Sequence, residues 1–269
     1  MKTIRSRGNP AFRNIVRLAR SAQERRSEGL ALIEGERLVS ALHASGREAA
    51  TLIIAESVLS WDQSRPLLAA IDAAKRIVLA DSLFSSISQV VSAQGVMALV
   101  EIPPVATWPT GPETALLLDG IQDPGNLGSI LRTAAAAGIR HVALSPGSAS
   151  AWSPKVIRAG MGAHFHLSIH EDDDLLERVR VSANTMASTS PRAPTSIYEA
   201  DLVSPISWLF GNEGAGLSQP LMDAAALRLR VPMAGPAESL NVAATVAICL
   251  FEQLRQRGPV GANAARRPA

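Results

Sequence analysis

Residues 206–218 read ISWLFGNEGAGLS. The apolar run at 206–210 is typical of a buried strand, and three glycines fall within the next six residues, 211–216. Glycine permits tight turns and a close approach of backbone amides to a ligand. The run has no Gly-Lys-Ser/Thr of a P-loop and lacks the spacing of the dinucleotide fingerprint. Because the polar pair Asn212 and Glu213 needs partners, we interpret the stretch as a ligand-binding loop rather than an empty turn.

Apolar strands alternate with helices on both sides of this loop. Further strands are expected at 115–118, 141–144, 165–169, 185–188 and 227–231, and helices at 127–137, 154–159, 172–181, 220–225 and from about 239 to 257. The last helix is apolar on most of its surface and should be largely buried. This alternation predicts an α/β domain with a mainly parallel sheet.

The N-terminal third repeats the alternation. Strands are expected at 30–33, 51–55, 77–79 and 96–100, and helices at 13–26, 35–44 and 65–74. Four prolines between Ile102 and Pro112 exclude a helix or a central strand, because proline fixes φ and lacks a donor. We therefore predict a basic arm with a smaller α/β domain at 1–102, a linker at 103–113, a larger α/β domain at 114–257 and a disordered tail at 258–269.

Positive charge is concentrated at the N-terminus. The chain has 269 residues and a net charge of +2, yet residues 1–26 contain eight Lys/Arg and a single acid, Glu24. A basic arm on a mildly acidic body is typical of a nucleic-acid-binding protein, although an Arg-rich solvated helix face would give the same count. With aromatic residues at 4%, contacts to RNA should depend on charge more than on stacking.

Several other classes of protein are disfavoured. The single cysteine, Cys249, excludes an internal disulfide and a multi-cysteine zinc site. His164 and His166 alternate along an expected strand, but no third ligand stands at a suitable spacing, so no metal is expected. No apolar stretch approaches the roughly 20 residues that span a bilayer, and no secretory signal is present. We expect a soluble cytoplasmic protein without membrane contacts.

Two further segments carry polar residues that packing alone would not select. In 123–132, which follows a strand and opens a helix, Asp123 or Asn126 can cap the helix. Arg132 is a lone charge in an apolar run, where it could bind a phosphate or simply face solvent. In 231–241, Ser239 is a candidate N-cap of the last helix, which would put Asn241 in the first turn beside free backbone donors.

Together, the three segments resemble a known family. Asn126 with Arg132, then Gly211-Asn212-Glu213-Gly214, then Ser239-Leu240-Asn241 are similar to the three motifs of the SpoU/TrmH family, RNA ribose 2′-O-methyltransferases of the SPOUT superfamily. This resemblance covers about 114–257. More loosely, residues 32–39 resemble the substrate-binding domain that precedes the catalytic domain in the members that act on ribosomal RNA.

The resemblance implies a deep trefoil knot at the carboxyl end, S-adenosyl-L-methionine bound within it, and a homodimer whose active sites are completed across the interface. It implies that the catalytic residues are Asn126, Arg132, Glu213, Ser239 and Asn241. The cofactor would be bound by Leu209, Gly211, Asn212, Gly214, Val231, Met233, Ser239 and Leu240. Candidates for RNA contacts are Arg5, Arg7, Arg13, Arg17, Lys155 and Arg158.

The leading interpretation is an S-adenosylmethionine-dependent ribose methyltransferase acting on RNA, with large-subunit ribosomal RNA as the expected substrate. Arginine is an awkward base, so Arg132 is expected to act together with a neighbouring RNA phosphate. A transfer-RNA methyltransferase and a non-catalytic RNA-binding or ribosome-assembly factor with the same fold are the alternatives. The residues do not separate housekeeping modification from self-protection against an antibiotic.

Overall fold

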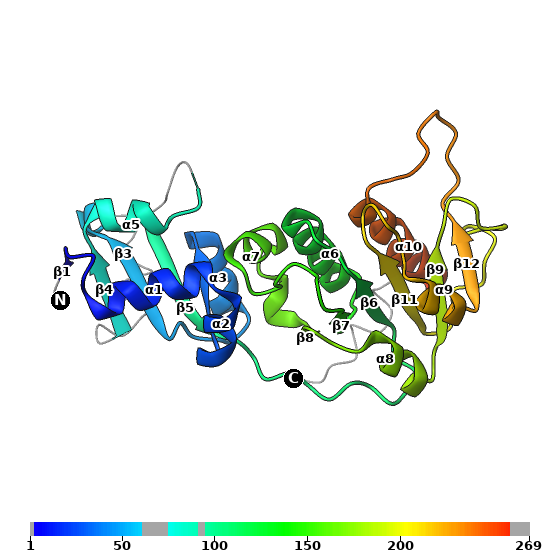
Figure 1. The fold of residues 1–269 in the computed structure, drawn as a ribbon, viewed down its shortest axis with the longest axis horizontal. Helices are drawn as coiled ribbons and strands as arrows, with labels where there is room; N and C mark the ends of the chain where they lie inside the picture. The colour runs from blue at the N-terminus through cyan, green and yellow to red at the C-terminus, as the bar shows by residue number, and fades with distance from the viewer. Residues whose placement is uncertain (1–2, 61–74, 91–94, 259–269) are drawn as a thin grey trace. The chain divides into compact units, whose positions relative to one another are not determined.

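A computed structural model of the chain describes residues 3–60, 75–90 and 95–258 (Figure 1). The chain forms two compact units. One comprises Met1–Pro104 with Ser150–His166, and the other comprises Val105–Ala149 with Leu167–Ala269. The chain therefore passes between the units at three places in the sequence.

In the first unit the described strands form a five-stranded sheet, in the order β1 (Thr3–Ile4), β4 (Arg76–Leu79), β3 (Thr51–Ala55), β5 (Val96–Glu101) and β2 (Leu30–Glu34). Strands β1, β4 and β3 are parallel, whereas β5 runs antiparallel to both β3 and β2. The sheet is mixed rather than mainly parallel because β5 enters between β3 and β2, which alternation alone does not reveal. The helix expected at 65–74 lies outside the described residues.

The basic N-terminal segment forms two helices, α1 (Pro10–Arg20) and α2 (Ala22–Glu28), and not the single helix expected at 13–26. The break is at Ser21, whose backbone is extended, with φ −111° and ψ 121°. The Ser21 N–H donates a hydrogen bond to the Arg17 carbonyl at the end of α1. The Ser21 hydroxyl accepts a hydrogen bond from the Glu24 N–H and so caps the start of α2. The other helical elements among the described residues of the N-terminal part are α3 (Glu36–Ala44), η1 (Glu56–Ser60) and α5 (Asp81–Ile87).

Residues 150–166 pack with the first unit although they lie between two strands of the second. They form α7 (Pro154–Gly160), which packs on β2, and the 3-10 turn η4 (Ala163–His166). The strand expected at 165–169 is therefore wrong in its first part, and β8 spans only Ser168–His170. His164 is buried with Nε2 2.9 Å from the Ala151 carbonyl, whereas His166 is exposed. The two imidazoles do not alternate along a strand, because η4 turns the chain there.

The second unit has a seven-stranded sheet among the described residues, and every neighbouring pair is parallel. Its order is β10 (Thr195–Ser196), β12 (Leu227–Arg230), β9 (Thr185–Thr189), β11 (Ile206–Gly211), β6 (Ala115–Asp119), β7 (His141–Leu144) and β8. The helices are α6 (Pro124–Ala136), α8 (Leu175–Val181), α9 (Gln219–Ala224) and α10 (Val242–Gln256). The predicted mainly parallel α/β domain is confirmed.

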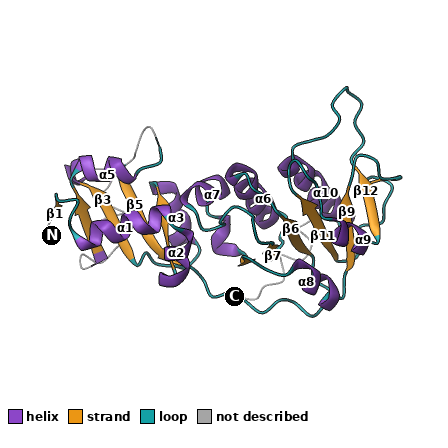
Figure 2. Ribbon diagram, viewed as in Figure 1, coloured by secondary structure: helices purple, strands orange, loops and turns teal. Residues whose placement is uncertain are grey.

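Helices cover both faces of this sheet (Figure 2). On one face, Leu117 and Leu209 pack with Leu175 of α8 and Leu221 of α9. On the other face α10 packs against α6 and β11, and the indole of Trp208 donates a hydrogen bond to Gln253 of α10. Both faces of the strands are therefore buried, which explains their nearly continuous apolar sequences.

Trp108 anchors the proline-rich segment to the second unit. Its side chain is buried, and its ring meets His170 and His141 edge-on at centroid distances of 5.1 and 5.9 Å. The Arg178 guanidinium lies 5.1 Å from the same ring, and Asp173 pairs with Arg178 at 2.8 Å. This part of the expected linker is therefore a packed element of the second unit.

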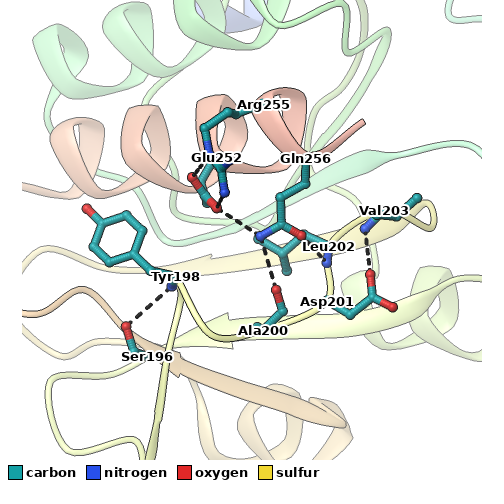
Figure 3. A network of polar contacts seen from close by, with 9 residues as sticks. All are labelled: Ser196, Tyr198, Ala200, Asp201, Leu202, Val203, Glu252, Arg255 and Gln256. Carbon is teal, nitrogen blue, oxygen red and sulfur yellow. Dashed lines mark hydrogen bonds and ion pairs between the residues drawn. The ribbon is translucent and has the colours of Figure 1, made fainter. Parts of the chain in front are cut away.

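A polar network holds the segment before β11 against the end of α10 (Figure 3). The Gln256 side chain accepts the Leu202 N–H at 2.9 Å and donates to the Ala200 carbonyl at 3.1 Å. Glu252, which is buried, accepts from Gln256 and from Arg255. The last helix is thus tied by side chains to backbone that precedes β11.

Candidate functional site

The second unit contains a cavity of about 380 Å³ at the carboxyl ends of β9, β11 and β12. Carboxyl ends of parallel strands are where open α/β folds bind ligands. The cavity is lined by Thr189, Ser190, Pro191, Phe210, Gly211, Asn212, Glu213, Gly216, Leu217, Val231, Met233, Ser239, Leu240, Asn241, Val242 and Thr245. The structure thus brings the second and third expected motifs to one cavity.

The glycine-rich loop folds back on itself after β11. Asn212 and Gly216 exchange two backbone hydrogen bonds of 3.0 and 2.9 Å, and the Asn212 side chain accepts the N–H groups of Gly214 and Ala215. A Cβ on Gly211 would overlap the backbone of Gly216 and Leu217. Only glycine therefore allows the strand to end against its own returning loop.

A chain of side-chain hydrogen bonds joins the three motifs. The Asn241 Nδ2 donates to Asn126 Oδ1 at 2.8 Å, and Asn126 Nδ2 donates to Glu213 Oε1 at 3.0 Å. The backbone N–H groups of Gln122 and Asp123 also donate to the Glu213 carboxylate, both at 3.2 Å. Three groups that precede Glu213 by 87 to 91 positions thereby meet its carboxylate, and Asn241 joins them through Asn126.

These donors favour the ionised form of Glu213. Partial burial acts to raise the pKa of this carboxyl, but the hydrogen bonds from Asn126 and from the backbone outweigh it and lower the pKa below its usual value. Glu213 is exposed in the single chain. It is therefore a carboxylate at neutral pH that can accept a hydrogen bond but cannot donate one.

Asn241, and not Ser239, caps the last helix. Helix α10 begins at Val242, and the Asn241 Oδ1 accepts the N–H groups of Ala243 and Ala244 at 2.9 and 3.4 Å. The expected helix start at 239 is wrong because residues 239–241 are not helical and the cap is formed by Asn241. The first-turn donors that were expected to be free are occupied by the Asn241 side chain, while Ser239 and Leu240 are exposed and line the cavity.

Arg132 lies apart from this cavity. It is exposed on α6, and its side chain has no hydrogen bond or ion pair with the described residues. Six residues separate it from Asn126, which corresponds to about 240° around a helix and about 9 Å along it. Asn126 and Arg132 therefore point in different directions from the same helix.

Two of the expected cofactor contacts, Leu209 and Gly214, do not line the cavity. Leu209 is buried on the opposite face of β11, and Gly214 is exposed outside the lining of the cavity. Thr189, the last residue of β9, and Ser190 and Pro191, which follow it, line the cavity but were not expected from the sequence. The signal that could have found them is their position at the carboxyl end of a strand that neighbours β11.

The expected RNA-binding residues all lie in the first unit. Arg5 is paired with Glu56, Arg17 lies 3.8 and 3.5 Å from the carboxylates of Glu24 and Glu28, and Arg158 donates to the Gln89 carbonyl at 3.2 Å. The side chains of Arg7, Arg13 and Lys155 are exposed and form no hydrogen bond or ion pair with the described part of the chain.

Within residues 3–60, 75–90 and 95–258, no three His, Cys, Asp or Glu are grouped to hold a metal ion. No helix in the described ranges has the length and apolarity needed to cross a bilayer.

Comparison with known proteins matches both parts of the chain. Residues 113–251 match the SpoU rRNA Methylase family, and residues 9–98 match the MRM3-like substrate binding domain. The 23S rRNA (guanosine(2553)-2′-O)-methyltransferase of Bacillus subtilis is 32% identical over 261 residues, which are 93% of this chain and 98% of that protein. An uncharacterized tRNA/rRNA methyltransferase of Synechocystis is 30% identical over 95% of this chain and 94% of its own.

Solved structures agree over nearly the whole length. The SpoU methyltransferase AviRb from Streptomyces viridochromogenes, in complex with the cofactor AdoMet, superposes with a TM-score of 0.83 at 27% identity and covers 93% of this chain and 98% of its own. An AdoMet-bound rRNA methyltransferase from Sinorhizobium meliloti gives a TM-score of 0.80 at 28% identity, covering 94% and 97%. The family match, the sequence identity and the fold agree, and the chain belongs to the SpoU rRNA methylase family.

Proposed function

We propose that this protein is an S-adenosylmethionine-dependent methyltransferase that methylates a ribose 2′-hydroxyl in large-subunit ribosomal RNA. The observation that carries the proposal is the hydrogen-bonded chain Asn241–Asn126–Glu213 beside the cavity, because it joins all three family motifs. Relatives named as 23S rRNA 2′-O-methyltransferases, and the MRM3-like substrate binding domain, support ribosomal over transfer RNA.

The residues of the cavity fit S-adenosylmethionine. Leu217, Val231 and Leu240 offer apolar walls, and the missing Cβ of Gly211 lets the loop turn tightly at the cavity edge. When bound, the cofactor supplies an electrophilic methyl group on a sulfonium. Because such a transfer is an in-line displacement, the main task of the protein is to hold donor and acceptor in position.

The hydrogen-bonded chain Asn241–Asn126–Glu213 determines which donors and acceptors face a bound ribose. Asn126 uses its oxygen for Asn241 and its nitrogen for Glu213, so its amide orientation is determined. One acceptor position on the Glu213 Oε2 and the second proton of the Asn241 amide stay available beside the cavity. We assign Glu213, Asn126, Ser239 and Asn241 to orienting the ribose and its 2′-hydroxyl.

Arg132 is assigned to the 2′-hydroxyl and its neighbouring phosphate, in the active site of the partner subunit. Arg132 does not line the cavity of its own chain, and its side chain has no partner among the described residues. A guanidinium binds a phosphate through paired hydrogen bonds, and the phosphate can then assist deprotonation of the hydroxyl.

The protein is proposed to act as a cytoplasmic homodimer with a trefoil knot at its carboxyl end. Apolar side chains on and beside α10 are exposed in the single chain, among them Phe251 at 47% and Leu240 at 40%. They support a dimer interface that includes the exposed side of α10. The contacts of Gln253 and Gln256 with residues 200–204 support a last helix enclosed by backbone that precedes β11.

RNA binding is assigned to the first unit. Arg7, Arg13 and Lys155 are the stronger candidates for phosphate contacts because their charges have no partner among the described residues. Arg5 and Arg17 would first have to leave Glu56 and the acids of α2. Arg158 keeps free donors beyond its bond to Gln89.

Methyl transfer from radiolabelled S-adenosylmethionine tests the function. The full chain should label protein-free large-subunit ribosomal RNA, at a nucleotide whose alkali-resistant linkage identifies a 2′-O-methyl, and leave small-subunit and transfer RNA unlabelled. Labelling of transfer RNA instead would mean that transfer RNA, and not ribosomal RNA, is the substrate. If calorimetry detects no binding of S-adenosylmethionine, the protein is a non-catalytic factor.

Mixed dimers test where Arg132 acts. Neither Arg132→Ala nor Gly211→Val should have activity alone, and Arg132→Ala should keep its affinity for S-adenosylmethionine. If Arg132 serves the partner's site, a one-to-one mixture of the two unfolded and reassembled variants should regain about a quarter of wild-type activity, because half the dimers are mixed and each has one intact site. No recovery, with mixed dimers present in native mass spectrometry, would place Arg132 in the site of its own chain.

A further inference from the structure

The glycine-rich loop is fastened at both ends to one dipeptide. At its start the Asn212 Nδ2 donates to the Gly120 carbonyl at 2.7 Å. At its end the Ser218 N–H donates to the Asp119 Oδ2 at 2.9 Å. Asp119 also stands opposite Gly211 in the pairing of β6 with β11. Residues 211–218 therefore form a closed loop whose two ends meet at the end of β6.

Ser145 holds this dipeptide from the other side. Its hydroxyl donates to the Asp119 Oδ1 at 3.0 Å and accepts the Gly120 N–H at 2.9 Å, while its backbone N–H bonds the Leu118 carbonyl. Each oxygen of Asp119 thus has its own donor. The two oxygens connect the segment after β7 with the loop after β11, across the intervening strand β6.

We propose that Asp119, held by Ser145, is a positioning residue that keeps the glycine-rich loop in the shape that binds S-adenosylmethionine. Neither residue lines the cavity, so both act through the loop. The inference depends on the proposed placement of the cofactor in this cavity. It adds to the three motifs a pair of residues that belongs to none of the expected contacts.

The chemistry of the two contacts determines which side chains can replace Asp119. The Ser218 N–H can only donate, so it needs an acceptor. The Ser145 hydroxyl accepts from Gly120 and directs its own proton to Asp119. An asparagine at 119 could keep the acceptor for Ser218 and donate its amide to Ser145, whose proton would turn to the Pro146 carbonyl at 3.4 Å. An alanine at 119 offers neither group.

Calorimetric titration of the full chain with S-adenosylmethionine tests this role. Asp119→Ala should weaken binding by about tenfold or more, which corresponds to the loss of one or two hydrogen bonds. Asp119→Asn should stay within about threefold of wild type, and Ser145→Ala should fall between them. In steady-state assays the KM for the cofactor should rise more than kcat falls, and hydrogen exchange should speed up at the amides of Asn212–Ser218.

Two further variants separate the possible failures. Asp201→Ala removes a carboxylate that also accepts a backbone N–H, that of Val203 at 3.0 Å, but lies outside the cavity lining; it should bind the cofactor normally. Gly211→Ala should lose binding, and normal binding by this variant would overturn the placement of the cofactor. If Gly211→Ala loses binding while Asp119→Ala keeps it, or if Asp119→Asn is as impaired as Asp119→Ala, the positioning role is wrong. Should Asp119→Ala not fold, Ser145→Ala decides by the same criterion.

Discussion

Asn126 shows how single residues of this site depend on partners that are remote in sequence. Its oxygen faces Asn241 and its nitrogen faces Glu213, so each of the three residues determines the orientation of the next. The motifs predicted that these residues belong together. They did not predict that Asn241 also caps α10, because a cap depends on where the helix begins and Ser239 was an equally good candidate.

Replacing Glu213 by Gln should disturb the loop without changing its size. One amide hydrogen would face the N–H of Gln122 or of Asp123, leaving a donor without an acceptor. We expect a loss of about 1–2 kcal/mol in the free energy of unfolding, measured with urea, and a clear loss of methyl transfer.

Glu199→Gln is the matched control for Glu213→Gln. Glu199 also accepts a backbone N–H, that of Ser196 at 3.3 Å, but it lies outside the cavity lining. This variant should keep full activity. If the two variants behave alike, the hydrogen bonds of Glu213 have no special role in the site.

At the scale of elements, strands and helices with a strong apolar period were predicted closely, including β6, β9, β11 and α6. The predictions were wrong where the chain changes direction locally. Ser21 splits one expected helix, and η4 replaces the start of an expected strand. Residues 189–191 of the cavity were missed because their role depends on the neighbour of β9 in the sheet, and strand order is not contained in a periodic pattern.

Removal of the Trp108 ring should destabilise the second unit although Trp108 belongs to none of the three motifs and does not line the cavity. Its burial between two histidine rings and the Arg178 guanidinium predicts a cost of about 3–5 kcal/mol for Trp108→Ala, measured by urea unfolding. Tyr198→Ala, at an aromatic residue that is 57% exposed, should change stability by less than about 0.5 kcal/mol. Equal small effects would mean that the proline-rich segment is a free linker.

At the scale of the whole molecule, buried histidines link stability to pH. Burial lowers the pKa of His164 to about 4, and burial together with the Arg178 charge lowers the pKa of His170 to about 4 despite Asp173. Burial also lowers the pKa of His141. In the unfolded chain these groups titrate near 6.5.

The unfolded chain therefore binds more protons than the folded one between pH 6.5 and about 4. The free energy of unfolding should have its full value above pH 6.5. Between pH 6.5 and about 4 it should fall by up to about 1.4 kcal/mol per pH unit for each buried histidine. Urea unfolding at pH 7.5, 6.0 and 5.0 measures the slope. His164→Gln keeps a donor for the Ala151 carbonyl and should reduce the dependence of the unfolding free energy on pH. His166→Gln, at an exposed histidine, is the control and should leave this dependence unchanged. If neither variant changes it, His164 does not contribute to the pH dependence.

The three chain passages between the units have a consequence for biosynthesis. The first unit needs Ser150–His166, and His166 leaves the ribosome 62 residues after Pro104. At about 5–20 residues per second, the nascent N-terminal part waits roughly 3–12 s for α7 and η4, the elements that complete its packing on β2. Vectorial synthesis therefore cannot complete the first unit before β6 and β7 of the second unit have emerged, and a chain truncated at Pro104 would lack α7 and η4.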